Sequence, residues 1–375
     1  MKIVIASDSF KGSLTSTEVA YSAEQGIRQV HANAEVVSVN VADGGEGTVE
    51  AIVEALGGEI VNTEVHDPLG RIITARYGIT GDTAIIEMAA ASGLPLLTQA
   101  ERNPWLTSTQ GTGDMILDAI SRGCRRFLVG IGGSATNDAG IGMLQALGFR
   151  FYDEHNQLIE SCCGGKLQEI VRIDDSQVLQ SVRDSQFIVA CDVDTPFCGP
   201  DGAAPVFAPQ KGADADMVNR LDMGMASFAH VIKQQYDIDI VSVEGAGAAG
   251  GMGGAFLAFL GATLKKGIDM VLDAIDFNAT IAGADLVITG EGKVDFQTAK
   301  GKTAAGVLQR AKKQHIPVIA IGGCVEICDS LLQMGFAGIY PILEEKVPLE
   351  VAMQRDFAMS NVTKTVGKII KEFKG

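Results

Sequence analysis

Short runs rich in valine and isoleucine recur along the chain, and each is followed by glycines or small polar residues and then by a helical pattern. The first run, residues 2–6, leads into a segment that begins with Thr15 and Glu18 at the spacing of a capping box. Apolar residues then recur on one face of this segment as far as Val30. Continuous apolar runs are typical of strands buried on both faces, so the repeated order of strand and helix predicts a parallel sheet.

Further runs of the same kind lie at residues 36–41, 285–288, 317–321 and 338–342. The first of these opens onto a glycine-rich stretch, residues 42–48, that carries Asp43 and Glu46. A last helix is predicted after Pro348. We expect these strands and the first run to share one sheet.

A long middle segment has strands of its own, predicted at residues 127–131 and 187–191, and a hairpin-like region at residues 72–86. Because chain ends commonly lie together and insertions enter at loops, we interpret this segment as an inserted domain. The predicted fold class is therefore α/β with two α/β domains. A discontinuous Rossmann-like or flavodoxin-like parallel-sheet domain would comprise residues 1–63 and 283–375, and the inserted α/β domain residues 64–282.

Charge and cysteine content narrow the classes of partner. The 375 residues include 46 Asp and Glu against 30 Lys and Arg, which gives a formal net charge of −16. Such a chain repels nucleic acids and anionic membrane surfaces, so neither is expected as a partner. The seven cysteines form no dense framework, which favours a reducing compartment and a cytoplasmic location.

One uncharged stretch, residues 245–264, is about as long as a membrane span. Glycines crowd its first half, so we predict a glycine-rich loop that leads into a short buried helix ending near Leu264. The same stretch contains Gly-x-Gly-x-x-Gly at residues 245–250, after a strand-like run at residues 238–243. No strand clearly precedes Asp269, where a dinucleotide fingerprint needs its acid, so close backbone packing is the commoner explanation. An NAD-dependent dehydrogenase stays an alternative.

Carboxylates and small polar residues gather just after the predicted strands, where ligands bind in open α/β sheets. This set comprises Asp8, Asp43, Glu46, Ser134, Thr136, Asn137, Asp138, Asp192, Asp194, Glu291 and Asp295. A single carboxylate there is usually a helix cap, but so many exceed what capping needs. Clustered carboxylates need a cation among them, and Mg²⁺ prefers one or two carboxylates together with phosphate oxygens. Lysines that could hold phosphates occur at positions 11, 211, 293 and 302, so the pattern indicates phosphoryl transfer from a magnesium nucleotide.

Two other catalytic signatures fail on spacing. Gly301-Lys302-Thr303 is similar to the end of a P-loop, but Phe296 stands where its first glycine belongs. The stretch 132–136 lacks a nucleophile elbow, and no histidine neighbours it in sequence, which disfavours Ser-His catalysis. A binding protein for organic acids is a further alternative, although it predicts loss of the acidic site residues.

Seven motifs occur in order along the chain: DSFKGSLTS (8–16), ADGGEGT (42–48), IGGSATNDAGIGM (131–143), CDVDTP (191–196), FAPQKGA (207–213), GAGAAGGMGGA (245–255) and ITGEGKVDFQT (288–298). Taken together, these motifs resemble the bacterial glycerate kinases of the first type. Asp194-Thr195 stands where the family usually carries an Asn or similar residue, so the sequence departs from the family pattern in that loop.

The resemblance implies ATP- and Mg²⁺-dependent phosphorylation of D-glycerate to 2-phosphoglycerate in glyoxylate or aldarate breakdown. A glycerate 3-kinase, or a kinase of another small hydroxy acid, is the alternative. D-glycerate and ATP are the expected small-molecule partners, and a homo-oligomer is left open.

Roles for individual residues are hypotheses from their chemistry. We assign catalytic roles to Asp192, as a Mg²⁺ ligand or general base, and to Lys11 and Lys211, which suit a carboxylate or phosphate. For Lys211 a solvated loop cation is an equal alternative. Metal binding is assigned to Asp192, Glu291 and Asp295, and substrate binding to Asp8, Asp43, Glu46, Asn137 and Asp138. The nucleotide is predicted on one of two glycine-rich turns, which contain Gly132, Gly133 and Ser134 or Gly247 and Gly250.

Overall fold

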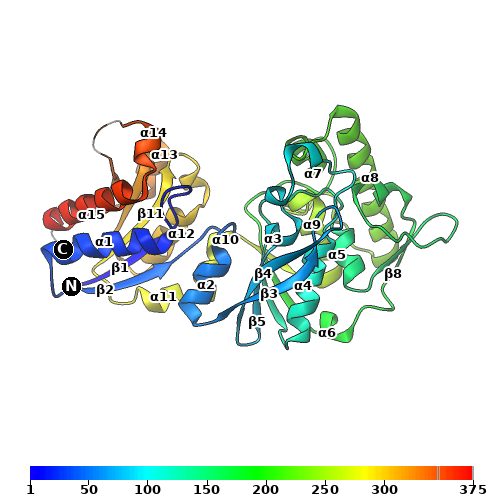
Figure 1. The fold of residues 1–375 in the computed structure, drawn as a ribbon, viewed down its shortest axis with the longest axis horizontal. Coiled ribbons are helices and arrows are strands. Elements are labelled where there is room, and N and C mark those ends of the chain that lie inside the picture. Colours follow the sequence, from blue (N-terminus) through cyan, green and yellow to red (C-terminus); the bar gives the residue numbers. More distant parts are fainter. Residues whose placement is uncertain (344, 346, 374–375) are drawn as a thin grey trace. The chain divides into compact units, whose positions relative to one another are not determined.

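The computed structural model describes residues 1–343, 345 and 347–373 of the chain. Contacts within it define two compact units (Figure 1). The first unit consists of Met1–Asp43, Glu50–Leu56 and Ile268–Gly375, and the second of Gly44–Val49 and Gly57–Gly267.

A five-stranded sheet forms the centre of the first unit. Its strands are β1 (Lys2–Ser7), β2 (Glu35–Asn40), β11 (Leu286–Val294), β12 (Val318–Val325) and β13 (Gly338–Pro341). They run in the order β13-β12-β11-β1-β2, and every neighbouring pair is parallel. The prediction that five valine- and isoleucine-rich runs share one parallel sheet is confirmed. The chain winds outward from β1 on one side and from β11 on the other, so the winding reverses between these two strands.

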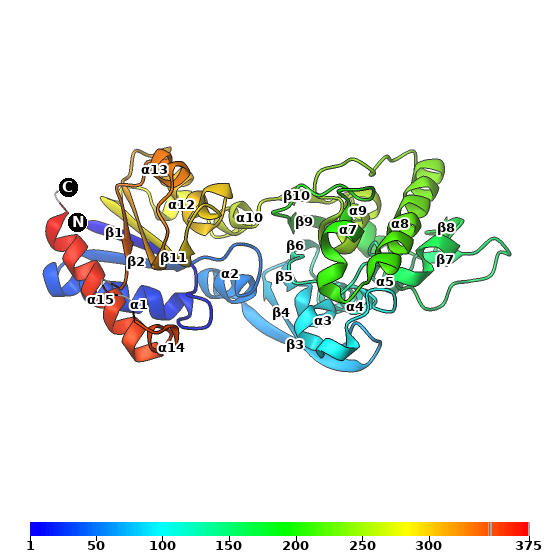
Figure 2. The same cartoon turned by 90° about the horizontal axis from the view of Figure 1, so that it is seen from above.

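Helices cover both faces of this sheet, as Figure 2 shows. On one face lie α1 (Ser16–Val30) and α15 (Arg355–Glu372), whose apolar side chains pack with Ile3 and Ile5 of β1. On the other face α12 (Thr303–Lys312) contacts β1, β11 and β12. The smaller helices of this unit are α2 (Thr48–Leu56), α10 (Gly267–Ala274), α11 (Phe277–Thr280), α13 (Asp329–Met334) and α14 (Leu349–Ala352).

The start of α1 follows the predicted capping box. The Glu18 N–H donates to Thr15 Oγ1 at 3.2 Å, and the Thr15 N–H donates to Glu18 Oε2 at 2.8 Å. Farther along, α1 approaches α15 so closely that a Cβ built on Gly26 would lie 2.4 Å from the Thr363 carbonyl oxygen. The missing side chain of Gly26 therefore sets the distance between the two helices.

The second unit contains a six-stranded mixed sheet in the order β10-β9-β6-β5-β4-β3. Its strands are β3 (Glu59–His66), β4 (Ile72–Thr80), β5 (Thr83–Glu87), β6 (Arg126–Gly130), β9 (Gln186–Ala190) and β10 (Thr263–Lys265). β4 and β5 pair antiparallel, as the hairpin-like pattern predicted, and β5, β6, β9 and β10 are parallel. A separate antiparallel pair joins β7 (Arg150–Tyr152) and β8 (Arg172–Asp174).

Helices of the second unit are α3 (Ala89–Ser92), α4 (Gln110–Ser121), α5 (Ile141–Ala146), α6 (Gln180–Arg183), α7 (Ala203–Phe207), α8 (Ala215–Tyr236) and α9 (Ala248–Leu260). Short 3-10 turns along the chain lie at Leu94–Leu96, Gln99–Glu101, Gly164–Glu169, Pro209–Lys211 and Thr298–Lys300. One apolar core unites the sheet and helices of this unit, and the stacked rings of Phe127 and Phe187 lie in it with centroids 4.8 Å apart.

The region around residues 238–264 differs from its prediction. Residues 238–243 form loop and turn rather than a strand. The helix α9 ends at Leu260 because Gly261 takes a left-handed backbone, with φ of 58°, and β10 then pairs with β9. Within the residues that the structure describes, we find no helix whose length and hydropathy would let it span a membrane.

The unit boundaries fall close to secondary-structure limits. The boundary predicted at residue 63 falls inside β3. This strand pairs with β4 from Glu59 to His66 and lies wholly in the second unit. The other predicted boundary, residue 283, comes after α10 and α11, although α11 and all of α10 except Gly267 belong to the first unit. A strand is hydrogen-bonded along its whole length, so a division inside β3 would break its pairing with β4.

Candidate active site

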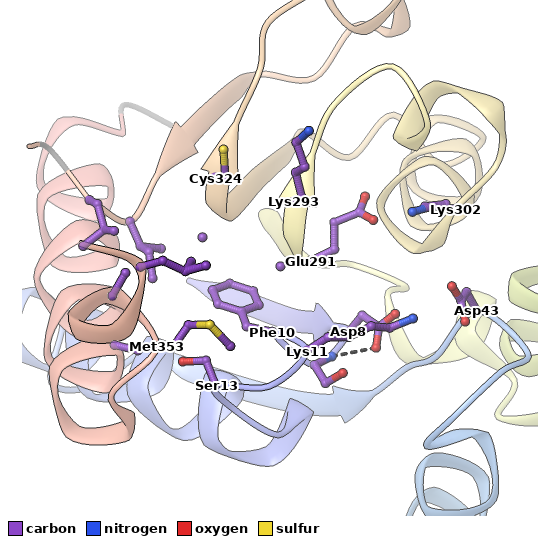
Figure 3. Close-up of a pocket in the computed structure, with 18 residues that line it drawn as sticks. Asp8, Phe10, Lys11, Ser13, Asp43, Glu291, Lys293, Lys302, Cys324 and Met353 are labelled. Atoms are coloured by element: carbon purple, nitrogen blue, oxygen red, sulfur yellow. Dashed lines mark hydrogen bonds between the residues drawn. The ribbon is translucent and has the colours of Figure 1, made fainter. Parts of the chain in front are cut away.

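A cavity of about 410 Å³ opens in the first unit (Figure 3). Its lining comes from the segments after β1, β2 and β13, from the last residues of β11 and β12, from Lys302 just before α12, and from the helices α14 and α15. It lies at the carboxyl ends of the strands, beside the reversal of winding between β1 and β11. Open α/β sheets bind their ligands at such a switch point.

Two buried carboxylates, Asp8 and Glu291, line one end of this cavity. Asp8 accepts hydrogen bonds from the Ser9 N–H at 2.6 Å and from Thr303 Oγ1 at 3.1 Å. Glu291 accepts one from Thr298 Oγ1 at 2.8 Å. Both side chains are thus held by threonine hydroxyl groups, Asp8 by that of Thr303 and Glu291 by that of Thr298, and neither threonine was a predicted site residue.

Burial changes the acidity of both carboxyl groups. It raises the pKa of Asp8 to about 6, and the negative charge of Asp43 adds to the rise. Burial likewise raises the pKa of Glu291 to about 7, although the Thr298 hydroxyl and the Lys302 ammonium lower it. A cation placed among these groups would offset the cost of their charges.

Three lysines surround the carboxylates in the cavity lining: Lys11, Lys293 and Lys302. Lys293 Nζ lies 3.2 Å from Asp295 Oδ2 and 3.0 Å from Glu326 Oε1. The other oxygen of Asp295 accepts the Gln297 N–H at 2.8 Å. Burial works to raise the pKa of Asp295, but this N–H and the Lys293 charge lower it overall. Asp295 is therefore engaged in placing Lys293 and the turn after β11, and it is not itself part of the cavity lining.

The donor set fits Mg²⁺ in its usual protein setting. No group of three or more His, Cys, Asp or Glu side chains that could hold a metal ion occurs in the part of the chain that is described. Mg²⁺ commonly takes only one or two carboxylates and completes its shell with phosphate oxygens and water. Asp8 and Glu291 supply such hard oxygen ligands beside lysines that suit phosphate.

A second polar cluster, within the second unit, surrounds the fully buried Lys211. Its Nζ donates to Ser134 Oγ at 2.7 Å and to the Thr136 carbonyl at 2.6 Å. Burial lowers the pKa of Lys211 to about 7, while the charge of Asp138 raises it. The environment of Lys211 is therefore the buried loop after β6, whereas the sequence left a solvated loop cation open.

Asp138 and Asn137 lie in the same buried loop. Thr109 donates to Asp138 Oδ2 through its N–H and its hydroxyl, both at 2.8 Å. Burial nevertheless raises the pKa of Asp138. The Asn137 side chain donates to Met225 Sδ at 3.2 Å. Within the part of the chain that is described, its Oδ1 and Thr136 Oγ1 are buried with no hydrogen-bond partner.

The remaining predicted residues of the second unit differ in exposure. Asp192 and Glu46 are exposed, and Asp192 Oδ1 accepts the Gly267 N–H at 3.0 Å. Gly132 and Gly133 are exposed as well.

Gly247 and Gly250, by contrast, are closed in by backbone. A Cβ on Gly247 would lie 2.1 Å from the Pro196 carbonyl oxygen, and one on Gly250 would lie 2.2 Å from that of Thr136. No strand precedes this run, and Ala249, Gly250 and Gly251 have left-handed backbones. Close packing accounts for these glycines, and the strand that a dinucleotide fingerprint requires is absent at residues 238–243.

The predicted residues thus fall into two groups. Asp8, Lys11, Asp43 and Glu291 line the cavity of the first unit, with Asp295 beside it. Glu46, Gly132, Gly133, Ser134, Asn137, Asp138, Asp192, Lys211, Gly247 and Gly250 belong to the second unit. The apolar part of the cavity, including Phe10 and Met353, had no sequence signal other than the position of Phe10 shortly after β1.

Comparison with known proteins gives matches over nearly the whole chain. A family model described as the glycerate kinase family matches residues 3–374. A glycerate kinase from Bacillus cereus is 46% identical over 377 residues, which cover 100% of this chain and 98% of that protein. A glycerate 2-kinase from Escherichia coli is 46% identical over 357 residues, covering 94% and 93%. A crystal structure described as a glycerate kinase 2 from Salmonella typhimurium LT2 is similar with a TM-score of 0.90 at 43% identity, covering 99% of this chain and 97% of that one.

Proposed function

The chain belongs to the glycerate kinase family, and from that premise we propose that it transfers the γ-phosphoryl group of ATP to the 2-hydroxyl of D-glycerate. The products are 2-phosphoglycerate and ADP, and the reaction serves glyoxylate or aldarate breakdown. Choice of the 2-hydroxyl is supported by the name of one relative, the glycerate 2-kinase of Escherichia coli.

One observation carries the phosphoryl-transfer chemistry. Two buried carboxylates of raised pKa, Asp8 and Glu291, share a cavity with Lys11 and Lys302 at the switch point of a parallel sheet. Phosphoryl transfer depends mainly on positioning and on neutralising the charge of the transferred group. Lysines bring neutralising positive charge directly, and buried carboxylates would bring it by holding Mg²⁺.

Asp8 and Glu291 would hold Mg²⁺, with Asp43 close enough for its charge to act on both. Mg²⁺ neutralises phosphate charge when it is bound. The chain's own contribution is to fix these ligands: Thr303 holds Asp8, and Thr298 holds Glu291. Lys11 and Lys302 bind phosphate oxygens, because a mobile ammonium suits a charge that moves along the reaction path.

The cytoplasm is the proposed location. All seven cysteines are free thiols, and such thiols suit a reducing compartment.

The product decides the proposal. Purified protein is incubated with D-glycerate, ATP and Mg²⁺ in the presence of enolase and without phosphoglycerate mutase. Phosphoenolpyruvate formed directly establishes 2-phosphoglycerate as the product. Phosphoenolpyruvate that forms only after mutase is added would establish the 3-kinase instead, and none in either case would exclude glycerate as the substrate.

A further inference from the structure

We propose that the cavity of the first unit is the ATP site, with the adenine base at its apolar end and the phosphates at its charged end. The inference rests on the proposed function, in which ATP is the phosphoryl donor. It differs from the prediction made from sequence, which placed the nucleotide on glycine-rich turns of the second unit.

The cavity is divided into two chemically different ends. In the view of Figure 3, the Phe10 ring lies between Met353 on one side and Asp8, Lys11 and Glu291 on the other. Apolar side chains line the Met353 end, namely Ile342, Leu343, Leu349, Ala352 and Ala358. A nucleoside triphosphate has the same division, with a flat apolar base at one end and a chain of negative charges at the other.

Large apolar side chains remain exposed at the apolar end. Leu349 is 72% exposed and Met353 is 38% exposed, and both line the cavity. Contiguous exposed apolar surface commonly marks a binding site. An adenine ring between them and Phe10 would cover this surface. The Ser13 hydroxyl in the same lining is a polar atom that a ribose or base could reach, because its Oγ is buried and has no hydrogen-bond partner within the described residues.

The charged end complements a magnesium triphosphate. Lys11 acts electrostatically on Asp8, and Lys302 acts on Glu291, so each carboxylate has a lysine charge nearby. ATP phosphates bring negative charge to the lysines, and the Mg²⁺ that accompanies them brings positive charge to the carboxylates. The phosphates and the Mg²⁺ of the ligand therefore complement the lysines and the carboxylates of the cavity.

Gly292 lines the cavity without a side chain of its own. A Cβ built on it would lie 3.3 Å from the Lys11 backbone nitrogen and 3.5 Å from the Phe10 Cα, so a larger side chain there would crowd the lining segment that carries Phe10 and Lys11. The volume of about 410 Å³ falls in the range of about 300–1,000 Å³ found for small-molecule sites. Gly247 and Gly250 offer no comparable space, because backbone carbonyl oxygens lie where their side chains would be.

Photoaffinity labelling locates the base directly. The full-length protein is irradiated with 8-azido-ATP and Mg²⁺, without glycerate, and labelled peptides are identified by mass spectrometry. We expect ATP-protected labelling in the segments that carry Phe10, Leu349 and Met353. Labelling within residues 131–143 or 245–255, or labelling that ATP does not suppress, would overturn the proposal.

A pair of substitutions on α14 provides a matched control. Ala352→Phe places a ring in the apolar end and is expected to weaken ADP binding, measured by calorimetry, at least tenfold. Glu350→Phe adds the same ring to an exposed position of that helix outside the cavity lining, and it should leave the ADP dissociation constant within twofold of the unmodified protein. Equal effects of the two variants would contradict the assignment.

The labelling and calorimetry experiments contain no glycerate, so they test the ATP site separately from the phosphorylation of glycerate. Labelling in the second unit by a protein that phosphorylates glycerate would overturn the nucleotide site and leave the function standing. Labelling at Phe10 and Leu349 by a protein inactive on glycerate would do the reverse.

Discussion

At the scale of single residues, the acidity of Asp8 and Glu291 links protonation to folding. Their ordinary pKa values are 3.8 and 4.5, whereas in the fold they are about 6 and about 7. Between these limits the folded protein holds more protons than the unfolded chain, so its free energy of unfolding falls as pH rises. In Glu291→Gln one of the two groups no longer titrates. We therefore expect the free energy of unfolding, measured with urea and without Mg²⁺, to fall less between about pH 4.5 and 7.5.

Glu350 supplies the control for this prediction, since its side chain is exposed on α14. Glu350→Gln should keep the slope of the unmodified protein. If the free energy of unfolding depended on pH with the same slope in Glu291→Gln and Glu350→Gln, burial would not raise the pKa of Glu291.

Thr298 is a positioning residue for Glu291. Its hydroxyl donates to Glu291 Oε1 at 2.8 Å and accepts the buried Asp295 N–H at 3.2 Å. Thr298→Val removes a hydrogen bond that lowers the pKa of Glu291, so the acidic limb of the kcat/KM profile should shift to higher pH. The unpaired Asp295 N–H should also cost about 1–3 kcal/mol of stability in urea unfolding.

Thr298→Ser keeps the hydroxyl group and separates positioning from packing. We expect its pH profile to follow that of the unmodified protein. A shift of equal size in the serine and valine variants would remove the hydrogen bond as the cause.

At this scale the sequence predicted which types of residue suit the site, but not the surroundings of each side chain. Lys211 was chosen because an ammonium suits a phosphate, yet its Nζ is engaged by Ser134 and the Thr136 carbonyl. Those partners lie 77 and 75 positions away in sequence, and no local pattern indicates them. Asp8 and Glu291 were easier, because Asp8 directly follows β1 and Glu291 lies in the second half of β11, and the sequence shows the burial of both strands.

At the scale of elements, a comparison of Gly250 within α9 and Gly261 at its C-terminal cap can show why this run is rich in glycine. Gly250 and Gly261 have similar left-handed backbones, with φ of 68° and 58°. Alanine at either site costs about 1 kcal/mol in backbone strain. At Gly250 its Cβ would also meet the Thr136 carbonyl oxygen at 2.2 Å, whereas a Cβ on Gly261 has no atom of the described residues within 4 Å beyond its chain neighbours. Gly250→Ala should therefore lower the free energy of unfolding several times more than Gly261→Ala.

Denaturant unfolding of the two variants gives the comparison, and ADP calorimetry adds a second readout. A Gly250→Ala protein of normal stability that had lost ADP binding would favour a nucleotide role for this turn over packing.

Strands were predictable where the sequence supplies a continuous β-branched run with nothing to compete. Residues 2–6 are of this kind, and they form β1 with a register that pairs Ile5 with Ile288. Residues 238–243 have a similar composition but carry Asp239, whose side chain accepts the Val241 N–H at 3.2 Å in a local turn. Such local hydrogen bonds compete with strand pairing, and composition alone does not show which prevails.

At the scale of the whole molecule, the order of strands in the first sheet explains what the sequence could and could not supply. Five runs of one type predicted a parallel sheet, but their order β13-β12-β11-β1-β2 depends on packing between segments more than 200 residues apart. The apolar end of the cavity joins Phe10 to Leu349 and Met353 across the same separation. No periodicity along the chain encodes that contact, so Asp8, Lys11, Asp43 and Glu291 were among the predicted site residues and the apolar residues of the cavity were not.

The two units carry separate hydrophobic clusters, and this predicts separate responses to damage. One cluster joins α1 and α15 to the first sheet, and another lies wholly within the second unit. Gly26→Ala improves helix propensity by about 1 kcal/mol. Its Cβ, however, would lie 2.4 Å from the Thr363 carbonyl and 2.9 Å from the Gly367 nitrogen, and backbone cannot move aside as a flexible side chain can. Because cooperative units open separately, hydrogen exchange should accelerate in β1, β11 and α15 and stay unchanged in β6 and β9.

Gly250→Ala is the reciprocal variant, since its clash lies in the second unit. It should accelerate exchange in β6 and β9 while β1 and β11 keep their protection. Both variants are followed by hydrogen exchange and mass spectrometry of the full-length protein under native conditions. If either variant accelerated exchange equally in both sheets, the chain would open as one cooperative body, and the separation of its cores would have no energetic meaning.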